Sequence, residues 1–284
     1  MALASTAALR VLDPGDRGAL LSLAQRDPVG NVIVIGRVAS VGLDPWRLGG
    51  EVWGWFEEGV LTAACWSGAN LVPVEAQHSP AALAAFAERA LRQGRRCSSI
   101  VGPAAAVVPL WQALEPRWGP AREVRDDQPL CVIDGPPAIA PDPLVRPVRR
   151  SELDTLLPAS IAMFTEEVGV SPVGRDGGAL YRARVGDLVA AGRAFARIED
   201  GRVVFKAEVG SASEEVCQVQ GVWVAPDRRG EGLSRAGMAA VVELARAAVA
   251  PVVSLYVNCY NAPARAAYAR VGFREVGTFA SVLF

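Results

Sequence analysis

The stretch with the residue types best suited to chemistry is 218–235 (QVQGVWVAPDRRGEGLSR), which lies between a strand-like and a helix-like segment. Its apolar part, Gly221–Val224, is followed by Pro226, two arginines and the glycine-rich segment Gly230–Gly232. Glycines let a backbone approach a ligand without obstruction by a Cβ, and the first amides of the following helix have no partner within the helix. This combination predicts a site for an anion such as a pyrophosphate.

A second stretch, 254–273 (SLYVNCYNAPARAAYARVGF), places a polar cap and a tyrosine on one helix. Asn261 is a good helix N-cap with Pro263 in the first turn, and Gly272 supplies the helix stop. Tyr268 follows Asn261 by seven residues and therefore lies on the same helical face. Taken alone, Asn261 is explained as a cap and Tyr268 as a half-buried core aromatic; beside an anion loop, both become functional candidates.

The pattern Arg229-x-x-Gly232-x-Ser234 after a V-x-V-x-P strand resembles the acetyl-CoA signature of the GCN5-related N-acetyltransferases (GNAT). The asparagine, tyrosine and glycine of the second stretch follow in the order of that family, and the resemblance covers residues 144–284. Residues 71–80 of the first half occupy the equivalent place but have neither the glycines nor the arginine. The whole chain resembles actinobacterial two-unit GNAT proteins with a degenerate N-terminal GNAT-like domain.

The resemblance implies acetyl-CoA as co-substrate and assigns it a site. The pantetheine arm would add to the edge of the strand Val222, Trp223 and Val224, an edge recognition through the backbone. Asn261 would hydrogen-bond along that arm, the Val224 N–H would polarise the thioester carbonyl, and Tyr268 would act as general acid for the departing thiolate. The pyrophosphate would be held by the loop residues Arg229, Gly230, Glu231, Gly232, Leu233, Ser234 and Arg235.

The general base is left open by the sequence. Many relatives carry a glutamate in the strand before the asparagine, where this chain has Tyr256. Glu166 and Glu167 fall where the family's first helices line the acceptor site, and they are weak candidates for the acceptor site or the base. Other candidates are Glu208, Glu214 and Glu215 near the central strands, and a water relayed through Gln218 or Gln220. Ser234 and Glu231 also depart from the family pattern.

The elements that must position these residues occur twice along the chain. Each half has an apolar hairpin (51–66 and 193–209), a third strand, an alanine-rich helix, a buried strand and a shorter helix. This order predicts an internal duplication and an α/β (α+β) fold, with tandem GNAT folds that each have a mixed, mostly antiparallel central sheet flanked by helices. The later elements span 70–74, 80–93, 98–101 and 104–114 in the first half, and 218–224, 234–249, 252–257 and 262–270 in the second.

A proline-rich segment separates the two halves. Residues 134–147 hold five prolines and no helical or alternating apolar pattern, which is typical of a stiff linker. We therefore expect a degenerate GNAT-like domain over 1–135, a linker over 136–143 and an acetyltransferase domain over 144–284.

The composition of the chain disfavours several kinds of partner and of catalytic site. The 284 residues carry a formal net charge of −1, which predicts no nucleic-acid and no membrane partner. The N-terminus is charged where a signal peptide would be apolar, so a cytoplasmic protein is expected. A single histidine and five cysteines without a C-x-x-C pair predict neither hydrolytic His machinery nor a metal site. The oligomeric state is not predicted.

The leading hypothesis is an N-acetyltransferase that moves acetyl from acetyl-CoA to a primary amine, carried by a small molecule or a peptide, by direct attack in a ternary complex. The absent strand glutamate and the half-degenerate architecture leave open a non-catalytic acyl-CoA-binding sensor or regulatory protein. A weaker alternative is an aminoacyl-tRNA-dependent transferase, which the near-neutral charge disfavours.

Overall fold

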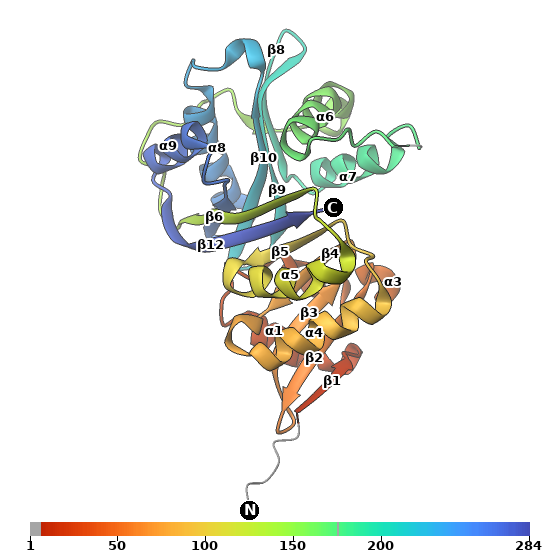
Figure 1. Cartoon of the computed structure of the whole chain (residues 1–284). Coiled ribbons are helices and arrows are strands. Elements are labelled where there is room, and N and C mark those ends of the chain that lie inside the picture. The colour runs from red at the N-terminus through yellow and green to blue at the C-terminus, as the bar shows by residue number, and fades with distance from the viewer. Residues whose placement is uncertain (1–6, 175) are drawn as a thin grey trace, which may run out of the picture. The chain divides into compact units, whose positions relative to one another are not determined.

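The computed structural model describes residues 7–174 and 176–284, and it divides into two compact units (Figure 1). Unit 1 comprises Met1–Leu130 with Gly277–Phe284, and unit 2 comprises Cys131–Val276. The last eight residues of the chain therefore belong to the first unit. The division into 1–135 and 144–284 predicted from the sequence assigns these residues to the second domain. Those sequence limits stay a prediction about independently folding domains.

Unit 1 is a mixed sheet with helices packed on it. Strands β1 to β4 pair antiparallel in sequence order, and β4 then pairs parallel with β5. Helices α4 and α5 bury Phe86, Leu110 and Trp111 against this sheet. The elements are β1 (Ala7–Val11), η1 (Pro14–Asp16), α1 (Arg17–Ala24), α2 (Val32–Val41), α3 (Pro45–Leu48), β2 (Glu51–Glu57), β3 (Val60–Ser67), β4 (Asn70–Val74), η2 (Ala76–His78), α4 (Pro80–Gln93), β5 (Ser99–Pro103) and α5 (Ala104–Trp118).

The C-terminal strand, β12 (Arg274–Leu283), completes the sheet of unit 1. Its residues Phe279–Leu283 pair antiparallel with β5, and Ala280 and Val282 enter the unit 1 core. Phe284 packs edge-on against Trp111 and Trp118 of α5. Apolar alternation in the sequence indicates a strand here but contains no information on which sheet the strand joins.

Unit 2 repeats the arrangement around the strand order β11-β10-β9-β8-β7. Here β7 to β10 pair antiparallel, and β10 pairs parallel with β11. The elements are β7 (Arg146–Pro147), η3 (Arg150–Glu152), α6 (Leu153–Val168), α7 (Ala179–Ala190), β8 (Ala194–Glu199), β9 (Arg202–Ala212), β10 (Val216–Val224), η4 (Pro226–Arg228), α8 (Leu233–Ala248), β11 (Val252–Tyr256) and α9 (Ala262–Val271). Strand β6 (Glu123–Ile133) crosses from one unit to the other.

The internal duplication predicted from the sequence is visible in the turns as well as in the strand order. The β2–β3 hairpin turns through Glu58 and Gly59, and the β8–β9 hairpin turns through Asp200 and Gly201. All four residues have φ between 48° and 81°, the conformation that a tight two-residue hairpin turn requires. The predicted fold class, mixed and mostly antiparallel sheets flanked by helices, is confirmed.

The two faces of the unit 2 sheet are covered by different helices. Figure 1 shows α8 and α9 on one side of β8–β10 and α6 and α7 on the other. Phe205 and Val209 of β9 belong to the same buried cluster as Met238 of α8. Ala196 of β8 and Val203 at the start of β9 belong to the cluster that contains Met163 of α6. The face under α6 and α7 carries the buried charged residues Lys206 and Glu208.

The expected linker residues 136–143 lie against unit 2. The Ala138 N–H donates to the Val271 carbonyl at 2.8 Å, and the Asp142 N–H donates to the Ala236 carbonyl at 2.9 Å. The Asp142 carboxylate, 4% exposed, forms an ion pair with Arg197 at 2.8 Å. The prolines thus stiffen a segment that is also bonded to α8, α9 and β8.

Candidate acyl-donor site

Strands β10 and β11 part within unit 2. Their parallel pairing joins Val216–Gln218 to Val252–Ser254. Beyond these pairs β10 runs on to Val224 and β11 to Tyr256. The far end of β10 therefore has one edge bonded to β9 and the other edge turned away from it.

The geometry of the β9–β10 ladder determines where the Val224 amide points. The Ala225 N–H donates to the Val204 carbonyl at 3.0 Å, and Val224 is paired with Phe205. Because hydrogen-bonded and non-hydrogen-bonded pairs alternate in an antiparallel ladder, Val224–Phe205 is a non-hydrogen-bonded pair. The N–H and C=O of Val224 hence point away from β9, toward the side on which β10 and β11 part.

The glycine-rich loop leads from this strand end into α8. Gly232 is the N-cap of α8, with φ of 83°. Because glycine has no side chain, no side-chain oxygen caps this helix. The amides of Leu233 and Ser234 are consequently left without an intrahelical acceptor. A Cβ at Gly230, whose φ is 89°, would meet open space. The loop thus presents unpaired amides beside an open backbone, as an anion site requires.

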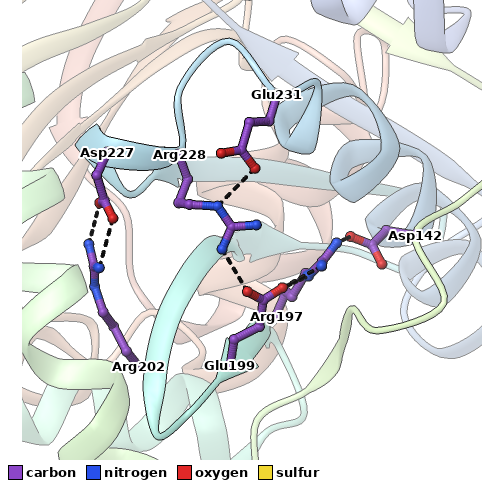
Figure 2. A network of polar contacts seen from close by, with 7 residues as sticks. All are labelled: Asp142, Arg197, Glu199, Arg202, Asp227, Arg228 and Glu231. Atoms are coloured by element: carbon purple, nitrogen blue, oxygen red, sulfur yellow. Dashed lines mark hydrogen bonds and ion pairs between the residues drawn. The ribbon is translucent and has the colours of Figure 1, made fainter.

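The charged side chains of the loop are mostly bound to one another and to the β8–β9 hairpin. Figure 2 shows Arg228 between Glu199 and Glu231, and Arg197 between Glu199 and Asp142. Arg228 contacts Glu199 at 2.6 Å and Glu231 at 2.8 Å. Hydrogen bonds from Arg228 and then Arg197 lower the pKa of Glu199 below its usual value. The negative charge of Glu231 is therefore compensated within the loop itself.

Arg229 joins the loop to the first helix of unit 2. Its Nε donates to the Val224 carbonyl at 3.1 Å, and its Nη2 contacts Glu166 of α6 at 2.6 Å. The other oxygen of Glu166 accepts from Trp223 Nε1 at 3.1 Å. The Glu166 carboxylate on α6 thus accepts hydrogen bonds from Trp223 of β10 and from Arg229 of the glycine-rich loop.

Asn261 is the N-cap of α9, as predicted from the sequence, and Tyr268 lies on the same helix. Asn261 Oδ1 accepts from the Ala264 N–H at 3.2 Å and caps α9. Tyr268 is 8% exposed and its ring packs edge-on against Phe273 with centroids 6.0 Å apart. Burial, and next the charge of Glu167, raise the pKa of the Tyr268 hydroxyl above its usual value. The hydroxyl consequently stays protonated across the neutral range.

A buried polar cluster lies on the sheet face under α6 and α7. Lys206, the sole lysine of the chain, is 1% exposed and contacts Glu208 Oε2 at 2.9 Å. Gln220 of β10 donates to Glu208 Oε1 at 3.0 Å, across the position of Gly210, where a Cβ would overlap the Gln220 amide. The only sequence signals for this cluster are a lone lysine and two charges spaced i, i+2 in an apolar strand.

The structure brings some of the predicted site residues together and leaves others apart. Direct contacts join Trp223, Val224, Arg229 and Glu166. The charge of Glu167 acts on the Tyr268 hydroxyl. Glu214 and Glu215 are exposed in the β9–β10 turn, so they are not placed with the others. Gln218 is buried, and its Nε2 has no partner among the described residues. Arg175 lies outside the described residues.

The described residues contain no cluster of His, Cys, Asp or Glu that could hold a metal ion. No helix in the same part of the chain is long and apolar enough to cross a membrane.

Comparisons with known proteins agree with this geometry. Residues 163–273 match the model of the "Acetyltransferase (GNAT) family", and residues 50–156 match a "Domain of unknown function (DUF4081)". A sequence search of curated proteins finds no match. The first of these matched segments contains the splayed strands, the loop and Tyr268.

Three solved structures are similar to this chain over nearly its whole length. A GCN5-related N-acetyltransferase from Sphaerobacter thermophilus is 18% identical, with 98% of this chain and 95% of that chain covered and a TM-score of 0.61. A GNAT-family acetyltransferase from Colwellia psychrerythraea is 12% identical (98% and 99% covered, TM-score 0.57). A tandem GNAT protein from the clavulanic acid biosynthesis pathway is 16% identical (98% and 98% covered, TM-score 0.54).

At these identities the three structures show the fold, and the family match over residues 163–273 is a separate result from the sequence. The likeness to a tandem protein also agrees with the duplicated strand order of units 1 and 2. Residues 163–273 thus match the acetyltransferase (GNAT) family, whose fold supports acyl transfer, and the whole chain has the fold of solved GNAT structures.

Proposed function

We propose that the protein transfers an acetyl group from acetyl-CoA to a primary amine by direct attack in a ternary complex. One observation supports this most strongly: the open edge of β10 leads directly into the uncapped, glycine-rich N-terminus of α8. An open strand edge can pair with the amide-containing arm of a ligand, and the adjoining helix N-terminus can bind its pyrophosphate.

The residues present fit such a co-substrate. The amides from Gly230 to Arg235 would hold the pyrophosphate, and no Cβ at Gly232 or Gly230 obstructs the approach. The edge of Val222–Val224 would pair with the pantetheine arm, toward which Asn261 would donate its Nδ2 while its Oδ1 caps α9. When bound, acetyl-CoA supplies an activated acyl group as a thioester.

The chain's own groups would then act on the reacting atoms. The Val224 N–H would donate to the thioester carbonyl oxygen and stabilise the negative charge that develops there. The Tyr268 hydroxyl, protonated in its buried site, would supply the proton that the departing sulfur takes. Glu166, held by Arg229 and Trp223, would position α6 against the loop. Glu167 would line the acceptor site.

A turnover assay tests this proposal. Purified protein would be mixed with acetyl-CoA and a panel of primary amines (the common amino acids, spermidine, kanamycin and a peptide with a free N-terminus), and released thiol would be measured. We expect thiol release that depends on at least one amine, with mass spectrometry showing the acetylated product. Binding of acetyl-CoA without turnover on any amine would contradict the transfer step.

Replacing Arg228 with Ala should weaken acetyl-CoA binding on the order of three- to tenfold, because the loop loses its bond to Glu199 and Glu231 is left uncompensated beside the phosphates. Calorimetric titration measures the effect. The matched control is Arg202→Ala, which removes an exposed ion pair to Asp227 of the same loop and should leave the Kd unchanged. Equal Kd values for both variants and the parent would show that the network does not position the loop.

A further inference from the structure

The Lys206–Glu208 pair is unusual in its burial and its place. Both side chains are removed from solvent, with 1% and 8% exposed, and removing two charges from water is costly even when they are paired. The surrounding strands have apolar side chains that fill the same layer on either side. The pair lies opposite the end of β10 that bears the proposed acyl-donor edge.

A bulge in β10 interrupts the pairing with β9 beside this pair. Between Gln220 and Trp223 the pairing with β9 shifts register, and Gly221 adopts φ of 59°. A Cβ at Gly221 would lie 3.2 Å from Glu208 Cδ, 3.2 Å from Lys206 Nζ and 2.9 Å from the Met163 methyl carbon. Glycine at this position therefore lets the Glu208, Lys206 and Met163 side chains pack directly against the β10 backbone, where a Cβ would crowd all three.

Within the pair, the glutamate side chain keeps the larger exposed fraction. Lys206 is closed off at 1% exposure, whereas Glu208 keeps 8%. Each oxygen of Glu208 accepts one hydrogen bond, from Lys206 or from Gln220, and a carboxylate oxygen can accept a second. Glu208 thus has a fixed orientation and unused acceptor capacity.

The charged groups around Glu208 keep it ionised. Burial favours the neutral acid, but the charge of Lys206, the hydrogen bonds from Gln220 and Lys206, and the charge of Arg184 on α7 together leave the pKa of Glu208 below its usual value. Tyr181 of α7 also faces this region, and burial with the charge of Glu208 raises its pKa to about 12. From α6 the packed neighbour at the bulge is the apolar Met163.

We propose that Glu208 is the base that takes the acceptor amine's proton at the β10 bulge, and that Lys206 is the positioning residue that holds this carboxylate in place. This inference rests on the proposed function. The amine nitrogen bonds to the thioester carbonyl carbon, and the carbon–sulfur bond breaks with its electron pair on sulfur. Tyr268 gives sulfur its proton, Glu208 takes the proton that the nitrogen loses, and exchange with solvent restores both groups.

The test compares four variants with the parent, on the amine with the highest turnover in the panel above. Glu208→Gln should lower kcat about 100-fold with the acetyl-CoA Kd within twofold of the parent. Glu208→Asp keeps the charge and the pair but withdraws the carboxylate, so it should also lower kcat. Lys206→Arg should retain most activity, and Glu243→Gln on the exposed face of α8 is the unchanged control.

A pH profile separates positioning from a merely structural role. Lys206→Met leaves the buried carboxylate without its cation, so the acidic limb of its kcat profile should move to higher pH than that of the parent, while Lys206→Arg keeps the parent's limb. The double variant Lys206→Met/Glu208→Gln should be as slow as Glu208→Gln alone.

The outcomes distinguish this inference from the proposed function. An active parent whose Glu208→Gln variant keeps kcat within twofold would overturn the inference and leave acetyl transfer intact. So would an acidic limb that does not move in Lys206→Met. A folded parent that binds no acetyl-CoA, or binds it without turnover on any amine, would overturn both.

Discussion

Replacing Tyr268 with Phe is expected to lower kcat by about 100-fold, the usual scale for losing a general acid, while the Kd for acetyl-CoA stays within twofold. The substitution removes only the hydroxyl group, and the ring keeps its packing against Phe273. Because the pKa of Tyr268 lies above its usual value, the parent should show no loss of activity from this group below pH 9. Thiol release under saturating substrates measures kcat, and calorimetry measures the Kd.

The matched control is Tyr260→Phe, which removes an exposed hydroxyl bonded to Asn258 near the start of the same helix. This variant should keep the parent's kcat. If Tyr268→Phe were as active as the parent, another group would have to protonate the sulfur, and the assignment of Tyr268 would be wrong.

Lys206→Met should produce the largest loss of stability, about 3 to 5 kcal/mol in the free energy of unfolding of unit 2 at neutral pH. The variant leaves Glu208 buried without its cation, and the penalty for an unpaired buried charge exceeds the apolar gain from methionine. Urea unfolding followed by tryptophan fluorescence measures the change through the shift in midpoint.

Two comparisons make this prediction specific. Lys206→Met/Glu208→Gln removes both charges and should recover most of the lost stability, because a neutral pair carries no ionic desolvation cost. Arg202→Met breaks an exposed pair with Asp227 and should cost less than about 1 kcal/mol. Equal destabilisation by Lys206→Met and Arg202→Met would mean that the Lys206–Glu208 pair is hydrated in solution.

The sequence predicts the local elements well, because each carries its own signal. The hairpin turns at Glu58-Gly59 and Asp200-Gly201, the alanine-rich helices and the Asn261 cap depend on neighbouring residues along the chain. The exchange of β12 into unit 1 is not predictable in this way. Apolar alternation along a strand indicates only that the strand joins a sheet. The pairing of β12 with β5 depends on how Phe279, Ala280 and Val282 pack in the folded protein.

The same distinction applies to the site. The anion loop is visible in sequence since its glycines and arginine lie within seven residues, and the tyrosine follows at helical spacing. The ion pairs Arg228–Glu199 and Arg229–Glu166 join residues far apart in the chain, so no spacing reveals them. Glu231 looks unfavourable for a phosphate site in sequence, but its charge is compensated by Arg228 in the structure.

Calorimetric titration of the purified protein with acetyl-CoA, beside Gly232→Trp and Gly192→Trp, tests the central claim most directly. Both glycines have positive φ, 83° and 69°, but Gly192 lies in the exposed turn after α7 and Gly232 caps α8 at the proposed pyrophosphate site. We predict stoichiometric binding by the parent and by Gly192→Trp, and none by a folded Gly232→Trp. Absence of binding by the folded parent, or equal binding by all three proteins, would contradict a donor site at the α8 loop.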